Sequence, residues 1–289
     1  MALSVVTFNI GGGDGKRHQK RNGDGDGTRH QKRSGGGDGT RKQKKEMINK
    51  FFSDHLPSVI YLQENPWRLH YIKKHVPTIK ERYEAVSHKH LDATVLYRKD
   101  VIKDEGSSEL WRSYAFQDAF RGESPSLDFL TFKERASFSV LTEIQTDTSF
   151  VAISWHGEHT GLSDQLKKEK FEDLLLVINE IDSKTKLPVV LGGDFNITLD
   201  SVTDSIKEKG FKVYKYDLQN RDRVIDFFVV TRDVKLSDVR AFSDYMYYIN
   251  ATGEAEKPQR QVFDHDPVEA KFTLLGDVYG LCQLFNQIL

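Results

Sequence analysis

Carboxylate, amide and imidazole side chains recur in this sequence at the ends of short hydrophobic runs, where a strand would give way to a loop. Oxygen ligands suit a hard divalent cation, and a histidine beside a carboxylate can move a proton near neutral pH. Groups of this kind, delivered by a rigid scaffold to one rim, are what a metal-assisted hydrolytic site needs. The residues concerned are Asn9, Gln63, Glu64, His156, Asp194, Asn196, Asp226, Asp264 and His265.

Taken alone, a polar residue that follows a strand is more often a turn former or a helix cap than a catalytic group. Asp226 differs from the others because it lies inside the apolar run RVIDFFVV, where a carboxylate is costly to bury unless it is paired or hydrogen-bonded. His265, next to Asp264 in FDHDPV, is the expected partner. The sequence therefore predicts a His–Asp pair within the site.

The elements that must position these side chains are mostly strands. Short runs rich in β-branched and aromatic residues predict the strands, and apolar residues within 44–52 and 166–181 recur with helical spacing. The first of these helices is expected to begin at about Lys44, and Ser163 is placed to cap the second. Many strands and few helices predict packed sheets with helices outside. The predicted strands are Ser4–Ile10, Pro57–Leu62, Thr94–Tyr97, Ser137–Ile144, Phe150–Trp155, Val189–Leu191, Arg223–Val230 and Val268–Leu274.

Six short segments, taken in order along the chain, resemble the motif series of the endonuclease/exonuclease/phosphatase superfamily: TFNI, YLQEN, SWHG, LGGDFN, RVIDFF and FDHDPV. Any one of them is short, but six in the right order are specific. The resemblance implies an α+β fold of the deoxyribonuclease-like kind, a four-layer α/β sandwich in which two packed mixed β-sheets are flanked by helices. It runs from Asn9 to Val268, and no shift in composition marks a second domain, so we expect a single domain over residues 1–289.

The resemblance also implies a metal site and a water-activating group. Asn9 and Glu64 would help to hold a divalent cation, Mg²⁺ or Mn²⁺, with Glu64 as the direct ligand and Asp264 beside them. Asp194 and Asn196 of GGDFN would orient or deprotonate the attacking water and contact the scissile phosphate.

Three further positions match catalytic or phosphate-binding residues of the same family. His265, paired with Asp226, would contact the phosphate or move a proton. His156 matches a histidine that deoxyribonuclease-like members carry at this place. Arg135 matches an arginine that contacts phosphate in some of these relatives, and a solvated surface position is the alternative interpretation for it.

Two departures from the family pattern count against two of its branches, the abasic-site endonucleases and the inositol polyphosphate phosphatases. Abasic-site endonucleases carry an aspartate two residues after the first-strand asparagine, and this chain has Gly11 there. Inositol polyphosphate phosphatases have LNYR-like and PAWCDR-like motifs where this chain reads GGDFNIT and RDRVIDFF.

We therefore expect a metal-dependent phosphodiester hydrolase, either an endonuclease or an exonuclease, in which water attacks with the help of the His–Asp pair. The alternative is a phosphatase or phosphodiesterase for a small-molecule or lipid phosphate ester. A binding module that has lost catalysis is disfavoured because all the expected polar positions are filled.

Residues 11–46 consist of three twelve-residue units, each a glycine and aspartate cluster followed by a basic tract. The segment holds eleven Lys or Arg against five Asp or Glu, so it carries +6; the whole chain carries −1, which leaves −7 on the remainder. Because the segment has no apolar residue to bury, we expect a disordered insertion in the loop after Asn9. Two interpretations stay open: a repeat expansion that a surface loop tolerates, and a flexible basic arm that holds a polyanion.

Composition bears on compartment and partners. The single cysteine, Cys282, excludes an intramolecular disulfide and fits a reducing compartment. No apolar run approaches the roughly 18 residues of a membrane span, and the start MALSVVTFNI lacks the charged n-region of a signal peptide. We expect an intracellular protein, in the cytoplasm or nucleus, with nucleic acid as its substrate and no membrane span; the oligomeric state stays open.

Overall fold

The computed structural model describes residues 3–11, 41–64, 69–86, 92–106, 129–158, 161–216, 224–231, 234–246, 262–263 and 265–274. Most of the repeat (residues 12–40), the expected metal ligand Asp264, and Cys282 lie outside these ranges. Among the helices of the described ranges, none is long and apolar enough to cross a membrane.

The first sheet is built around two parallel strands, β1 (Leu3–Asn9) and β2 (Val59–Gln63), which pair from Val5 with Val59 to Asn9 with Gln63. Antiparallel strands extend it on both sides, in the order β11-β12-β1-β2-β4-β3. Parallel neighbours end at the same edge of a sheet, so Asn9 and Gln63 lie side by side there. The added strands are β11 (Val234–Ala241), β12 (Val268–Leu274), β4 (Ala93–Arg98) and β3 (Tyr83–Ala85).

The second sheet repeats this plan around the parallel pair β7 (Thr148–His156) and β8 (Val189–Asp194), in which His156 faces Asp194. Strand β10 (Asp226–Val230) runs antiparallel to β8 and sets Asp226 opposite Asp194. The order is β5-β6-β7-β8-β10-β9, and the remaining strands are β5 (Ile102–Gly106), β6 (Ala136–Glu143) and β9 (Lys212–Tyr214). Each sheet thus delivers polar side chains from two parallel strand ends.

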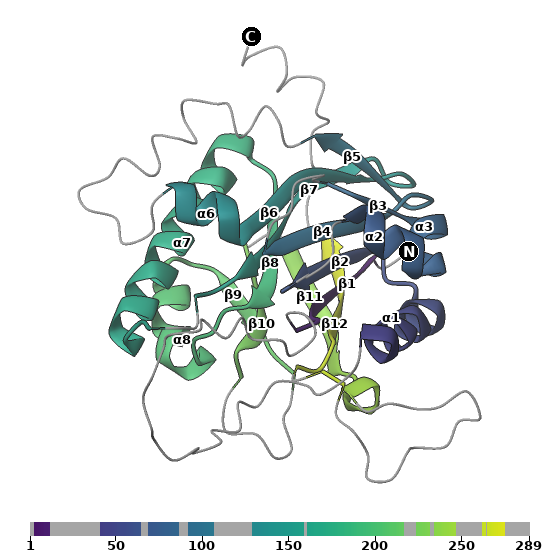
Figure 1. Ribbon diagram of the computed structural model, residues 1–289. Helices are drawn as coiled ribbons and strands as arrows, with labels where there is room; N and C mark the ends of the chain where they lie inside the picture. The colour runs from purple at the N-terminus through teal and green to yellow at the C-terminus, as the bar shows by residue number, and fades with distance from the viewer. Residues whose placement is uncertain are drawn as a thin grey trace, which may run out of the picture.

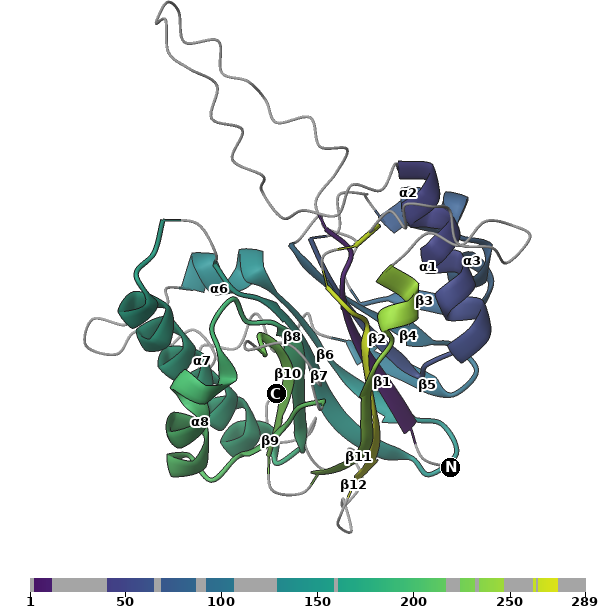
Figure 2. The same cartoon turned by 90° about the horizontal axis from the view of Figure 1, so that it is seen from below.

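Helices cover the outer faces of both sheets and complete four layers (Figure 1; Figure 2 shows the layers edge-on). A short 3₁₀ helix, Ser243–Met246, follows β11. The helices over the first sheet are α1 (Arg41–His55), α2 (Leu69–His75) and α3 (Pro77–Arg82); those over the second are α6 (Phe129–Arg135), α7 (Asp164–Thr185) and α8 (Leu199–Glu208). The α+β sandwich expected from the sequence is confirmed.

Three buried clusters fill the three interfaces between these layers, because successive side chains of a strand point to opposite faces. In β1, Val5 packs between the sheets, whereas Val6 and Phe8 pack under α1. In β10, Phe228 lies between the sheets and Phe227 packs under α7. Each large apolar side chain buried in this way contributes about 1.5–3 kcal/mol of hydrophobic free energy, which stabilises the sandwich.

Several element bounds differ from those expected. Helix α1 begins at Arg41, earlier than Lys44, so the last six residues of the insertion expected to be disordered are helical. Their composition explains this, because lysine, arginine, glutamine and glutamate are all good helix formers. Strands β7 and β8 continue through His156 and Asp194, which makes these polar residues part of the sheet. The Ser163 cap is observed, with its side chain accepting a hydrogen bond from the backbone N–H of Leu166 at 3.2 Å.

Candidate active site

Four strand ends meet at one edge of the sandwich and bring predicted site residues together. Asn9 ends β1, His156 ends β7, Asp194 ends β8, and Asp226 begins β10; all four are buried. Asn9 Nδ2 donates a hydrogen bond to Asp194 Oδ2 at 2.9 Å. This bond joins the two sheets at the edge where their parallel pairs end.

The amide of Asn9 is oriented by the turn that follows it. Gly11 adopts φ of 63°, a left-handed conformation that glycine takes without a Cβ penalty, and its N–H donates to Asn9 Oδ1 at 2.8 Å. The amide nitrogen therefore faces the carboxylates, and it donates to Glu64 Oε1 at 3.2 Å as well as to Asp194. Asn9 bridges the two carboxylates as a hydrogen-bond donor.

Glu64 lies just beyond β2 in a strained backbone conformation. Its φ is 48°, and the left-handed region costs a non-glycine residue about 1–3 kcal/mol. A backbone hydrogen bond from the Glu64 N–H to the Asp92 carbonyl, 2.9 Å long, holds it there. Strain of this kind is maintained only where the surroundings enforce it, and here it turns the Glu64 carboxylate toward Asn9.

The His–Asp pair expected from the sequence is present. His265 Nδ1 lies 2.8 Å from Asp226 Oδ2, and its Nε2 lies 3.6 Å from Asp194 Oδ2. Because an ionised carboxylate can only accept, this contact places a proton on Nδ1 and directs Nε2 toward Asp194. Asp226 thereby sets the tautomer and the orientation of the imidazole ring.

Asp194 lies at the centre of the cluster and is 1 % exposed. Burial is the main cause that raises the pKa of the Asp194 carboxyl above its ordinary value, and the nearby charge of Asp226 adds to it. His265, His156 and the hydrogen bond from Asn9 act in the opposite direction. The net effect makes Asp194 a better proton acceptor than an exposed aspartate.

His156 and Arg135 lie together on the other side of Glu64. Arg135 Nη1 is 3.3 Å from His156 Nδ1, and a guanidinium can only donate, so His156 accepts at Nδ1 and carries its proton on Nε2. That nitrogen is 3.6 Å from Glu64 Oε1. Arg135 also lies 3.4 Å from a carboxylate oxygen of Asp92 and keeps 22 % of its side chain exposed. Arg135 therefore contacts the cluster through His156 and is not an isolated surface cation.

The GGDFN turn holds Asn196 beside Asp194. The Asn196 N–H donates to Asp194 Oδ1 at 2.9 Å, and its Nδ2 donates to the Gly157 carbonyl at 2.8 Å. A Cβ at Gly193 would lie 1.9 Å from the Trp155 carbonyl oxygen, and one at Gly157 would lie 2.1 Å from the Phe195 oxygen. Both glycines are needed for this close approach of the β7 and β8 ends.

Among the described residues, two groups of side chains place possible ligand atoms within 4.8 Å of one another: Glu64, His156 and Asp194, and Asp194, Asp226 and His265. Because His156 accepts from Arg135 at Nδ1 and carries its proton on Nε2, the ligands that remain in the first group are the carboxylates of Glu64 and Asp194. Carboxylate oxygens are ligands that suit Mg²⁺ and Mn²⁺.

Three contributors to the site were not predicted from the sequence. Gly157 supplies the carbonyl that Asn196 binds, and Asp92 supplies the contacts to Glu64 and Arg135. The third is Lys44, which is buried beside the end of β1. A signal for Lys44 is present in the sequence, because it lies three and four residues before Met47 and Ile48 on the apolar face of a predicted helix.

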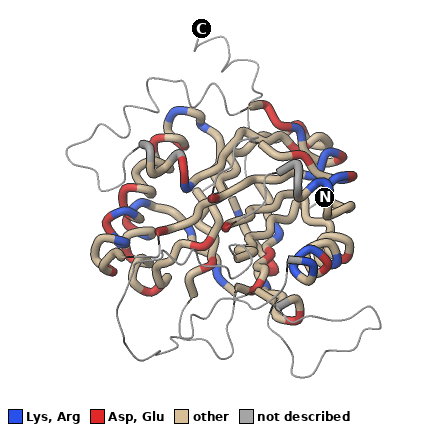
Figure 3. The backbone as a smooth tube through the Cα atoms, in the orientation of Figure 1, with Lys and Arg blue, Asp and Glu red and all other residues tan. Residues whose placement is uncertain are grey.

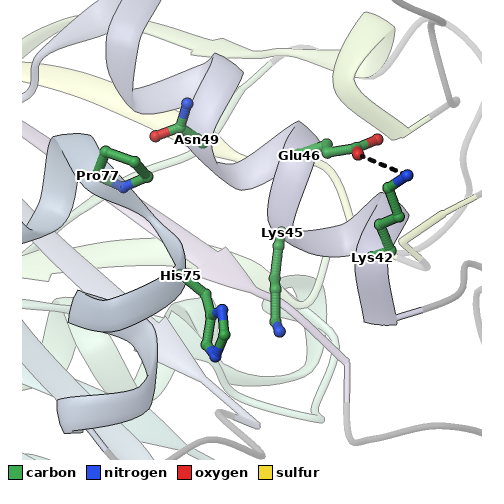
Figure 4. Close-up of a pocket in the computed structure, with 6 residues that line it drawn as sticks. All are labelled: Lys42, Lys45, Glu46, Asn49, His75 and Pro77. Carbon is green, nitrogen blue, oxygen red and sulfur yellow. Dashed lines mark ion pairs between the residues drawn. The ribbon is translucent and has the colours of Figure 1, made fainter.

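A separate open cavity of about 520 Å³ lies on the outer helical layer. In Figure 4 the Lys45 side chain extends toward His75, while Lys42 pairs with Glu46 at 3.7 Å. Asn49 and Pro77 complete its lining. None of the polar residues at the strand ends lines this cavity, so the chemistry of the site belongs to the edge of the sheets.

The family model for the endonuclease/exonuclease/phosphatase family matches residues 6–258. The chain belongs to this family. Members of the endonuclease/exonuclease/phosphatase family hydrolyse phosphoester bonds and generally depend on a divalent metal, so the protein is a phosphoester hydrolase. A search of curated protein sequences gives no match.

Solved structures of the family share the fold at low sequence identity. A family member from Bacteroides thetaiotaomicron is 17 % identical, with 96 % of this chain and 99 % of that one covered and a TM-score of 0.64. A mannosyl-6-phosphatase from the same organism is 16 % identical, with 94 % and 100 % covered and a TM-score of 0.63. D. rerio TDP2, solved with a single-strand DNA product, is 13 % identical, with 94 % and 99 % covered and a TM-score of 0.55. At these identities, the three solved structures show that this chain shares their fold, and nothing about its substrate.

Proposed function

We propose that the protein is a metal-dependent phosphodiesterase that acts on nucleic acid. The observation that carries the chemistry is the His265–Asp226 pair directed at Asp194, with Asn9 joining Asp194 to Glu64. The preference for nucleic acid is supported by the charge of +6 on residues 11–46, a segment that begins two residues after Asn9. A polyanion gains salt-dependent, sequence-independent affinity from such a segment.

Glu64 is the residue we assign as the direct ligand of Mg²⁺ or Mn²⁺, with Asp264 as a further ligand. Asn9 holds Glu64 and Asp194 at a fixed separation by donating to both. When bound, the cation offsets the negative charge of the phosphodiester and polarises a P–O bond.

Asp194 accepts the proton of the attacking water in this proposal. Its raised pKa favours this role, and the backbone N–H of Asn196 fixes the orientation of its carboxylate. As the water oxygen bonds to phosphorus, the bond to the leaving oxygen breaks and the water proton moves to Asp194.

His265 supplies the proton that the leaving oxygen needs. Asp226 holds the ring at 2.8 Å and stabilises the positive charge of an imidazolium, which can then donate from Nε2. Arg135 and Asn196 are the donors we assign to the phosphate oxygens, and His156 supports Glu64 from the opposite side. Fixed donors of this kind lower the barrier because they need no reorganisation during the reaction.

The experiment that tests the function is a substrate panel with Mg²⁺ or Mn²⁺. Plasmid DNA, end-labelled DNA and RNA oligonucleotides, bis-p-nitrophenyl phosphate, a sugar phosphate and sphingomyelin cover the phosphoester classes. We expect cleavage of a nucleic acid by the wild type and not by His265→Ala. Hydrolysis confined to the sugar phosphate or the lipid would replace the nuclease proposal with the alternative, a phosphatase or phosphodiesterase for small or lipid esters.

A further inference from the structure

Lys44 is a buried lysine at the N-terminal end of α1, only 5 % exposed. Its neighbour Lys42 has 85 % of its side chain exposed, and Figure 3 shows the basic start of this helix. An ammonium group is costly to bury unless polar groups replace the lost water. The position of Lys44 therefore implies specific partners.

Two partners of Lys44 are backbone carbonyls next to the catalytic cluster. Its Nζ lies 3.2 Å from the Ile10 carbonyl oxygen and 3.3 Å from the Gly11 carbonyl oxygen. The same nitrogen lies 5.7 Å from the centre of the Phe263 ring, two residues before His265. One cation thus contacts the chain just after Asn9 and just before His265.

The turn held by Lys44 is the turn that orients Asn9. The N–H of Gly11 binds Asn9 Oδ1 at 2.8 Å, and this leaves Asn9 Nδ2 facing Glu64 and Asp194. A second bond, from the Ile10 N–H to the Gln63 carbonyl at 3.1 Å, fixes the other side of the turn. Without the ammonium group the Ile10 and Gly11 carbonyls would lose a donor that holds them, and Asn9 would lose part of its support.

Lys44 belongs to the third unit of the repeat. In the three twelve-residue units, Lys20, Lys32 and Lys44 occupy the same position. The tract 41–46 of the third unit is folded as the start of α1, so this copy contributes a buried residue to the protein. The end of the third unit is therefore part of the folded protein and not only an accessory insertion.

We propose that Lys44 is a positioning residue of the active site: it holds the Ile10–Gly11 turn and, through it, the amide of Asn9 between Glu64 and Asp194. The inference rests on the proposed function for its kinetic consequence. Because Lys44 is buried under the turn, we expect it to affect the geometry of the reacting groups and not to contact the substrate. Outer groups that orient metal ligands typically change metal affinity or activity about 10- to 100-fold.

The test compares Lys44→Met, which keeps the apolar stem and removes the charge, with Lys42→Met as the exposed control from the same helix. On bis-p-nitrophenyl phosphate we expect Lys44→Met to lower kcat by about 10- to 100-fold with KM nearly unchanged, and Lys42→Met to leave both at the wild-type values. Equal kinetics for the two variants would overturn the proposal.

A double-mutant cycle with Asn9→Ala separates positioning from a general loss of structure. If Lys44 acts through Asn9, Lys44→Met should change kcat by less than about twofold in the Asn9→Ala background. Independent, multiplicative effects would show that Lys44 does not act through Asn9. Should Lys44→Met melt below the assay temperature, Lys44→Arg takes its place in the cycle, because it keeps the charge while it moves the donors.

Mn²⁺ binding, followed by the electron paramagnetic resonance signal of the free ion, gives a readout that needs no turnover. We expect about tenfold weaker binding for Lys44→Met and wild-type binding for Lys42→Met. If the wild type binds Mn²⁺ but hydrolyses no ester, the proposed function fails while the effect of Lys44 stays measurable. If the wild type is active and Mn²⁺ binding is the same in all three proteins, the role of Lys44 is refuted alone.

Discussion

The layer between the two sheets has an apolar end and a polar end, built by the same strands on the same face. In β1 the inward positions change from Val5 to Asn9, and in β8 from Val190 to Asp194. In β10, Phe228 packs between the sheets two residues after Asp226. Within two to four residues along a strand, the inward side chains therefore change from apolar residues that pack between the sheets to polar residues of the candidate site.

A buried hydrogen-bond network marks the boundary between these ends. Thr7 donates to Gln63 at 3.1 Å, and Gln63 Nε2 donates to Ser154 Oγ at 3.0 Å across the sheets. All three residues are 0–1 % exposed. The apolar end stabilises the fold because it removes hydrocarbon from water, whereas holding charged groups in a fixed geometry at the polar end is destabilising. Substitutions at the two ends should therefore separate stability from activity.

The largest expected effect is on turnover at the polar end. His265→Ala removes the proton donor, and Asp194→Asn removes the proton acceptor, so each should lower kcat by about two to four orders of magnitude. Both variants should stay folded at the assay temperature, which thermal melting checks. Asp200→Asn, an exposed carboxylate of α8, is the matched control. Wild-type rates in either site variant would show that the residue roles are assigned wrongly.

The apolar end should respond in the opposite way. Phe228 is fully buried, and Phe228→Ala should cost about 3–5 kcal/mol of unfolding free energy, measured by urea denaturation. The rate per folded molecule should change little. Leu176→Ala, at a position 48 % exposed, should shift stability by no more than about 0.5 kcal/mol. A large loss of rate in folded Phe228→Ala would mean that the two ends are coupled.

The charge on Asp194 should make the stability of the folded protein depend on pH. Because the folded-state pKa of the Asp194 carboxyl is raised above its ordinary value of 3.8, the folded state binds the proton more tightly than the unfolded state. Stability therefore falls as the pH rises from about 3.8 through the raised pKa, and the cost persists above it. In metal-free protein, the melting temperature of Asp194→Asn relative to wild type should increase from pH 4 to pH 7. A difference that stays constant over this range would contradict the shift.

The smallest effect on turnover is expected for a deletion within the repeat. Deleting residues 12–35 removes two repeat units, keeps Lys44 and α1, and takes away seven Lys or Arg against three Asp or Glu. Turnover on a small diester should be unchanged. Affinity for an oligonucleotide should fall and depend less steeply on salt, because fewer counterions are released. An unchanged salt dependence would leave repeat expansion as the explanation of the first two units.

Much of the site could be predicted from the sequence, because the polar residues follow apolar runs whose ends must lie at a sheet edge. The Asp226–His265 pair and the polar ends of β1, β7 and β8 follow from this pattern, whereas Asp264, expected to be a metal ligand, lies outside the described residues and its role stays a proposal. Arg135 allowed two interpretations; it lies 3.3 Å from His156, beside the cluster, and its role toward phosphate stays a proposal. The sequence pattern does not indicate the start of α1 at Arg41, because the third unit of the repeat has no apolar residue at helical spacing before Met47.

The family, the alternation of apolar and polar positions along each strand, and the residue types at the strand ends can all be read from the amino-acid sequence. These are local properties, set by side-chain chemistry and by the two-residue period of a strand. The hydrogen bond from Asn9 across the sheets to Asp194 and the place of Lys44 under the Ile10–Gly11 turn depend on how the layers pack. Such contacts join residues far apart in sequence, and they follow from the packing of whole layers, which no local pattern specifies.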